Sequence, residues 1–207
     1  MKQALKFVAF ALATLAVLPA AGLYLVSSWL MGAERAFPGW SQAFSLLPGF
    51  VGAYGRRAFY RLVLDRCGTD AWLGFGTIIS HPTARIGDRA YVGAFCCLGD
   101  VTVGDDVLLG SHVSVANGGA QHGIERLDIP IREQPGQWPR VTIGQDSWIG
   151  DRAVILADVG RHCVIGAGAV VTRPIPDYGI AHGVPAKVAS WRKEPADQPA
   201  PPCPVGG

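Results

Sequence analysis

Residues 143–171 read IGQDSWIGDRAVILADVGRHCVIGAGAVV, and aliphatic residues recur along this stretch at intervals of six, usually with glycine next. The same interval links Ile86, Val92 and Leu98 earlier in the chain. Strand side chains alternate between two faces and glycine tolerates tight bends, so each hexad describes a short strand and a corner. One hexad cannot bury its apolar face alone. The stretch from 73 to 172 therefore predicts hexads that stack coil upon coil.

The repeat slips by a residue or two at several corners and breaks completely between Asn117 and Arg140. The interrupting segment, NGGAQHGIERLDIPIREQPGQWPR, is rich in glycine, proline and charge and contains no hexad. Such a composition is typical of a loop. Insertions in solenoids leave on one face, which is often the binding face. We expect an excursion loop over residues 117–140.

The N-terminal segment has no charged residue from Phe7 to Ala33 and is long enough to cross a membrane as a helix. A cleavable signal peptide and a re-entrant helix bent at Leu18–Pro19 are the alternatives. The apolar run continues to Met31, which favours a retained anchor. Both flanks are basic, so the positive-inside rule favours the cytoplasm for both. We expect residues 1–35 to attach the chain through residues 7–31 to a bacterial inner membrane, with the rest on the cytoplasmic side.

The remaining segments divide the chain further. Residues 36–66 predict an amphipathic segment with a basic face, which caps the solenoid, lies on anionic lipid, or does both. Residues 67–172 form the predicted β-helix. Residues 173–193 contain Pro174 and Pro176, which we expect to stop the regular stacking. Residues 194–207 are proline-rich and predicted to be disordered.

Composition excludes some classes of function. The formal net charge of +2 argues against nucleic acid as a partner. The five cysteines are odd in number and show neither a disulfide framework nor metal-ligand spacing. We expect small buried thiols, as in a reducing cytoplasm, and no metal.

Among the five histidines, His122 differs because it lies in the excursion loop between glycines. A neutral imidazole can accept a hydroxyl proton near neutral pH. Acyl transfer to an alcohol needs such a base, and accessible backbone N–H groups beside glycine can stabilise an oxyanion. Glu125 and Asp128 are the candidates for orienting the imidazole.

Three stretches, SHVSVANGGAQHG, VTIGQDSWIGDRAVIL and VIGAGAVVTRPIPDYGIAHGVPAKV, carry a resemblance. Together they resemble the hexapeptide-repeat acyltransferases of the maltose/galactoside and capsule-polysaccharide O-acetyltransferase type, over residues 67–190. The resemblance implies a left-handed parallel β-helix, a homotrimer with active sites between subunits, acetyl-CoA as co-substrate and His122 as general base. It also implies that CoA is bound by Trp148, Gly166, Ala167, Gly168, Ala169, Arg173, Lys187 and Arg192.

For the acceptor we expect contacts from Cys96, His112, Asn117 and Glu125. Cys96 stands where many relatives carry asparagine, which puts a small free sugar in doubt as the acceptor. Soluble members of the family lack the hydrophobic N-terminus, so a membrane-borne acceptor explains residues 7–31 most simply. The prediction is therefore O-acetylation of a cell-surface polysaccharide or a lipid-linked glycan precursor.

Three alternatives stand beside this prediction. The first is N-acetylation of an amino-sugar, for which an amine needs no strong base. The second is a non-catalytic scaffold, against which the histidine-bearing loop argues. The third is a zinc enzyme like the β-helix carbonic anhydrases. That class needs three converging imidazoles, and the spacing of His81, His112 and His122 does not match it.

Overall fold

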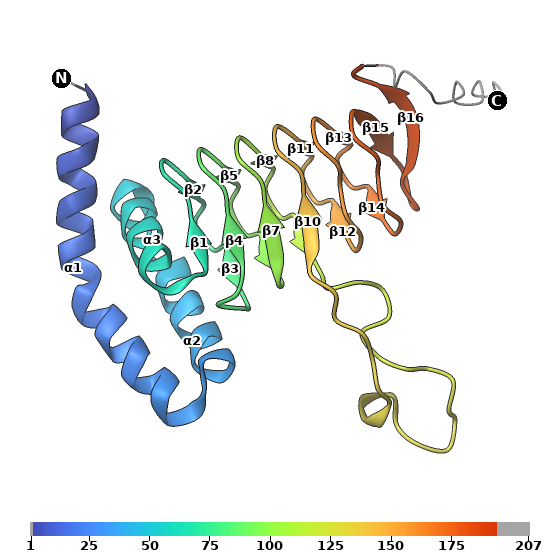
Figure 1. The fold of residues 1–207 in the computed structure, drawn as a ribbon, viewed down its shortest axis with the longest axis horizontal. Coiled ribbons are helices and arrows are strands. Elements are labelled where there is room, and N and C mark those ends of the chain that lie inside the picture. Colours follow the sequence, from blue (N-terminus) through green and yellow to red (C-terminus); the bar gives the residue numbers. More distant parts are fainter. Residues whose placement is uncertain (1, 194–207) are drawn as a thin grey trace.

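The computed structural model describes residues 2–193; the tail that we predicted to be disordered lies outside the described residues. Three helices come first: α1 (Lys2–Met31), α2 (Ala33–Ser45) and α3 (Gly49–Val63). A solenoid of short parallel strands follows, interrupted by a long loop (Figure 1). The chain thus forms a helical layer at one end of a β-solenoid, which confirms the predicted fold class.

The solenoid has three sheets, which we number by the order in which the chain enters them. The first sheet contains β1 (Arg66–Cys67), β4 (Arg85–Ile86), β7 (Val101–Val103) and β10 (Val141–Ile143). The second contains β2 (Trp72–Leu73), β5 (Tyr91–Val92), β8 (Leu108–Leu109), β11 (Trp148–Ile149), β13 (Val164–Ile165), β15 (Gly179–His182) and β16 (Lys187–Trp191). The third contains β3 (Ile78–Ile79), β6 (Cys97–Leu98), β9 (Ser114–Val115), β12 (Val154–Ile155) and β14 (Val170–Val171).

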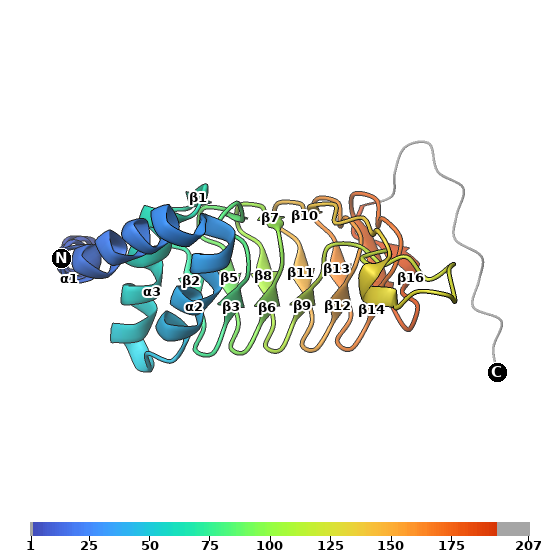
Figure 2. The ribbon, with the colours of Figure 1, turned by 90° about the horizontal axis from the view of Figure 1, so that it is seen from below.

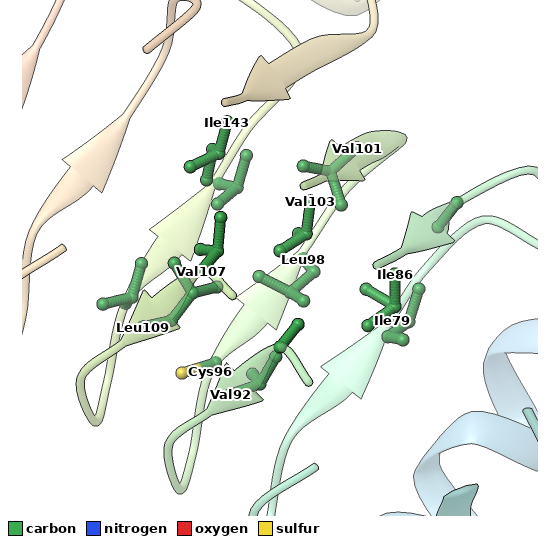
Figure 3. Packing of buried hydrophobic residues seen from close by; sticks show 14 of the residues in the cluster. Ile79, Ile86, Val92, Cys96, Leu98, Val101, Val103, Val107, Leu109 and Ile143 are labelled. Carbon is green, nitrogen blue, oxygen red and sulfur yellow. The ribbon is translucent and has the colours of Figure 1, made fainter. Parts of the chain in front are cut away.

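The register explains the six-residue period. Ile86 pairs with Val103 and Val92 with Leu109, and all twelve strand pairings between neighbouring coils are parallel. The second residue of each two-residue strand is buried and points into a narrow core (Figure 3). Small residues just before the strands fill the remaining space. Among them, the Cys96 thiol lies 3.1 Å from the carbonyl oxygen of Gly110 in the next coil, and burial raises its pKa.

Glycine follows the strand at two of the three corners. These glycines are Gly68, Gly87, Gly104, Gly144 and Gly160 after the first sheet, and Gly74, Gly93, Gly110, Gly150 and Gly166 after the second. At each of them an added Cβ would lie within 2.9 Å of an atom of the next coil. Side chains therefore do not fit there.

The third corner, between the third and first sheets, is different. Four of its five equivalent positions carry a side chain: Ser80, Ala116, Leu156 and Thr172. The backbone of neighbouring coils is therefore less crowded at this corner. The excursion loop leaves the solenoid here, between β9 and β10, as Figure 1 shows.

The helical layer closes the N-terminal end of the solenoid (Figure 2). We predicted one amphipathic segment between the hydrophobic helix and the solenoid, and two helices, α2 and α3, occupy it. Helix α1 continues through Pro19 without interruption and bends along its length (Figure 1). By length and composition, Lys6–Met31 is the one helix of the described residues that could cross a membrane.

Arg56 joins the helical layer to the first coil. Its side chain is 1% exposed, its Nε donates to the carbonyl oxygen of Leu73 at 2.9 Å, and its Nη1 donates to the carbonyl oxygen of Leu47. Desolvation by burial lowers its pKa. Ser41 adds a second link, because its hydroxyl accepts the N–H of Ile79 at 2.9 Å. The layer and the first coil therefore form one packed unit.

At the other end, the stacking continues past Thr172, where we placed the end of the regular repeat. Ile175 forms a parallel bridge to Val159, and β15 pairs with β13. Pro174 and Pro176 flank that bridge, where their missing N–H groups are not needed. The antiparallel strand β16 then covers β15 and closes the solenoid.

Candidate active site

The excursion loop is fixed at its base by Asn117. Its side-chain amide donates to the carbonyl oxygens of Asp100 at 2.8 Å and Pro139 at 3.0 Å, and its side-chain oxygen accepts the N–H of Asp100 at 3.0 Å. Asn117 is only 4% exposed. It thus joins both ends of the loop to the preceding coil, and its side chain has little surface left for an acceptor.

Gln134 organises the far part of the loop. Its buried side chain accepts the N–H of Arg126 at 3.0 Å and donates to the carbonyl oxygen of the same residue at 2.6 Å. The N–H of Gln137 donates to the carbonyl oxygen of Ala120 at 2.8 Å. The outgoing and returning halves of the loop therefore lie side by side, which gives the segment around His122 a defined position.

His122 is exposed and lines a hollow of about 490 Å³ together with Gly119, Gly123, Glu125 and Gln134, among others. Its ring meets the Trp138 ring edge to face, with centroids 5.5 Å apart. In residues 2–193 its imidazole has no hydrogen-bond partner. Glu125 lines the same hollow, whereas Asp128 is paired with Arg126. A small molecule can therefore reach His122, and of the two acidic candidates for orienting it only Glu125 lines the same hollow.

A second hollow, of about 420 Å³, lies at the corner between the second and third sheets. It is lined by Ser111, His112, Asp151, Arg152, Ala167 and Gly168. Two aromatic contacts approach it along the corner: Phe75 meets Phe95 edge to face with ring centroids 5.6 Å apart, and Phe95 stacks on His112 with centroids 5.3 Å apart. The structure thus brings His112, expected at the acceptor, together with Ala167 and Gly168, expected at CoA.

The two hollows lie on different edges of the solenoid. The loop with His122 leaves at the third corner, whereas His112 and Ala167 sit at the second corner, across the third sheet. Trp148 faces outward from β11 on the second sheet and is 55% exposed. A single chain therefore does not place the expected base beside the expected CoA residues.

The other predicted site residues are scattered. Cys96 and Ala169 are 1% exposed and face the interior. Gly166 lies against His182 at the second corner. Arg173 is exposed at the third corner and Lys187 is exposed on β16.

Arg192 is held at the first corner, where its Nη1 donates to the Asp146 carboxylate at 3.2 Å. The basic residues expected at the CoA phosphates therefore do not form one cluster within the chain.

Sequence reasoning missed Gln134, Asp151 and Arg152, which line these hollows, and Trp138, which contacts the His122 ring. Arg152 could have been found by aligning coils, because it takes the same left-handed corner position as His112 one coil earlier, with φ of 59° and 58°. Gln134 and Trp138 carry no such periodic signal. Their roles depend on how the loop folds back on itself.

Two of the remaining histidines, His81 and His162, make structural contacts. His81 Nδ1 lies 2.8 Å from Glu34 of α2, and His162 Nδ1 lies 2.8 Å from Asp146. The hydrogen bond from His162 is the main cause that lowers the pKa of Asp146. Within residues 2–193 no group of three His, Cys, Asp or Glu side chains could hold a metal ion.

The chain is similar to known hexapeptide-repeat proteins. A family model described as bacterial transferase hexapeptide (six repeats) matches residues 140–173, and one described as hexapeptide repeat of succinyl-transferase matches residues 83–116. A probable acetyltransferase of Mycobacterium tuberculosis is 35% identical over 131 residues, which cover 59% of this chain and 43% of the relative. Galactoside O-acetyltransferase of Escherichia coli is 31% identical over 140 residues, 64% of this chain and 66% of the relative.

Solved structures agree with this fold. A hexapeptide-repeat acetyltransferase of Vibrio cholerae O1 biovar eltor, complexed with acetyl coenzyme A, superposes with a TM-score of 0.67 at 24% identity, covering 78% of this chain and 88% of that one. The molecule is thus a left-handed parallel β-helix of hexapeptide repeats. The chain resembles the hexapeptide-repeat acyltransferases in its repeats and its fold, as its motifs predicted. It spans 43% and 66% of the length of the two curated relatives.

Proposed function

We propose that the protein is an acetyl-CoA-dependent O-acetyltransferase that acts on a sugar hydroxyl of a cell-surface polysaccharide or a lipid-linked glycan precursor. The observation that carries the proposal is the accessible His122 in a loop hollow built by Asn117 and Gln134. The activities named for the two relatives support acetyl transfer, and the acetyl coenzyme A complex of the Vibrio cholerae structure supports the donor.

In the proposed reaction, His122 accepts the hydroxyl proton of the acceptor as its oxygen attacks the thioester carbonyl. The carbon–oxygen bond forms, the carbon–sulfur bond breaks, and the CoA thiolate takes the proton back from the imidazolium. The acetyl group passes directly to the sugar, without an acyl-enzyme. Backbone N–H groups at Gly119 or Gly123 are the candidates for stabilising the oxyanion.

The proposed active form is a homotrimer with its sites between subunits. The first sheet is polar on its outer face, with Arg66, Arg85, Thr102 and Thr142. The second sheet instead presents exposed Tyr91, Leu108 and Trp148. An exposed apolar stripe of this kind marks an interaction surface. A neighbouring subunit on that stripe would supply what one subunit lacks: a His122 loop facing a CoA groove.

The membrane is part of the proposal, because the exposed apolar surface of α1 has no occupant among residues 2–193. We assign the protein to the bacterial inner membrane with the solenoid on the cytoplasmic side, where acetyl-CoA is made. An acceptor on a lipid carrier would then approach from the end of the solenoid that holds α1.

The test is glycan mass spectrometry on cells that lack the protein and carry wild type, His122→Ala or the control His81→Gln. His81 contacts Glu34 and lies in neither hollow. We expect acetylated glycan with wild type and His81→Gln, and its loss with folded His122→Ala. Full acetylation in His122→Ala would refute the assignment of His122 as the general base. Residual acetylation confined to an amino-sugar would point to N-acetylation instead.

A further inference from the structure

Helix α1 has two opposite faces of different character. One face packs on α2 and α3 through Val17, Ala21 and Tyr24, which are 7%, 7% and 4% exposed. The opposite face carries Val8, Leu12, Leu15, Val26 and Leu30, spaced at helical intervals and 52–68% exposed. The exposed face is thus apolar along nearly the whole helix, whereas the packed face is covered by α2 and α3.

The packed face fixes α1 to the solenoid. Trp40 Nε1 of α2 donates to Ser27 Oγ of α1 at 3.1 Å, and Arg57 of α3 lies over the Phe10 ring at 4.2 Å. Arg57 also pairs with Asp70 of the first coil at 3.1 Å. Helix α1 therefore cannot move as an independent rod, because it is joined through α3 to the first coil.

This attachment excludes a perpendicular crossing by α1. A crossing would bring the elements packed along it into the hydrocarbon, including Arg57, Asp70 and the exposed Arg61. Charged side chains are costly inside a bilayer. If α1 lies in the membrane plane instead, its apolar face is buried and these charges stay at the surface.

We propose that the helical layer docks on the surface of an anionic bilayer with α1 in the membrane plane, without crossing it. This inference rests on the membrane attachment proposed above and not on the acetyl transfer. The charges of the helical layer fit an anionic partner: Lys6 and Arg57 line a hollow at the N-terminal part of α1, Arg61 of α3 is exposed, and Asp70 is neutralised by Arg57. Phe50 and Val51 of α3, 75% and 86% exposed, add further apolar surface to the helical layer.

With α1 in the membrane plane, the length of the solenoid sets the height of the candidate active site above the membrane surface. The solenoid extends away from the helical layer, and the upper part of α1 runs across its end (Figures 1 and 2). The loop with His122 leaves from the third coil and returns to the fourth, so its base lies roughly 10–14 Å beyond the first coil at one strand spacing per coil. The parallel axes of the proposed trimer would place all three helical layers on the same membrane. A sugar on a lipid carrier could then reach the site without leaving its bilayer.

The test is sidedness of labelling in the full-length protein. Single cysteines are placed before and after the apolar run, as Gln3→Cys and Gln42→Cys, in a Cys97→Ser/Cys203→Ser background. The remaining cysteines of residues 2–193 are buried. An impermeant maleimide is applied to spheroplasts and to inverted membrane vesicles. We expect both sites to react only in inverted vesicles; reaction of one site on each side would overturn the in-plane arrangement while leaving membrane attachment intact.

A second measurement tests the docking face itself. Leu12→Glu/Val26→Glu places charge on the exposed face, and the control Thr102→Glu/Thr142→Glu places it on the polar first sheet. We expect at least a tenfold loss of binding to phosphatidylglycerol-containing vesicles for the first pair only. Unchanged binding would overturn the proposal. If wild-type protein is soluble because copies of the chain bury the α1 face between them, membrane attachment is overturned as well. Glycan acetylation in cells would still test the proposed acetyl transfer independently.

Discussion

Gly93 offers the sharpest test of how the coils stack. A Cβ at this corner would lie 2.6 Å from the carbonyl carbon and oxygen of Gly110 in the next coil. Ordinary contact begins near 3.4 Å, so Gly93→Ala must separate the two coils by about 0.8 Å. The hydrogen bonds from Gly93 to Leu109 and from Tyr91 to Val107 are 2.9 and 2.8 Å long and would stretch beyond useful range.

The expected cost follows from these contacts. Two weakened hydrogen bonds lose about 1 kcal/mol each, and overpacking adds about 1–3 kcal/mol. If the strain partly relaxes, Gly93→Ala lowers the free energy of unfolding by about 2–4 kcal/mol. At about 2–4 °C per kcal/mol for a chain of this size, the midpoint of thermal unfolding falls by roughly 5–15 °C.

The assay is thermal unfolding of the full chain in detergent, followed by circular dichroism. The control is Gly39→Ala in α2, where an added Cβ meets nothing within 4 Å. That change should stabilise the protein by up to about 1 kcal/mol, since alanine favours helix. A Gly93→Ala midpoint within about a degree of wild type would refute the argument that backbone crowding requires glycine at this corner.

Three further predictions concern other parts of the molecule. Asn117→Ala removes three hydrogen bonds at the base of the loop, so limited proteolysis within residues 118–139 should accelerate at least tenfold while the thermal midpoint changes little. Burial raises the pKa of Cys67 and of Tyr60 to about 12, so the unfolded chain loses these protons first and stability falls as pH rises above about 9. Unfolding between pH 8 and 10.5 should show this decline, and Cys67→Ser should reduce its slope; an unchanged slope would show that Cys67 is not its cause. Leu108→Glu on the second sheet should dissociate the proposed trimer in light scattering, whereas Thr102→Glu on the first sheet should leave it intact, and a stable Leu108→Glu trimer would place the interface elsewhere.

The sequence by itself determined the solenoid, because its information is local and periodic. A six-residue interval with glycine at the bend leaves few other ways to bury Ile86, Val92 and Leu98. It also identified the excursion loop, because residues 117–140 break the period, and it singled out His122 inside that loop. The apolar run of α1 was equally plain from composition.

The tertiary structure decided which of these features meet. The loop leaves at the third corner because neighbouring coils crowd the other two, and that distance between backbones has no signature in a single hexad. The separation of His122 from His112, and the burial of Asn117 and Arg56, depend on contacts between residues far apart in the chain. The two faces of α1 differ only because α2 and α3 cover one of them. A uniformly apolar sequence cannot say which face will be covered.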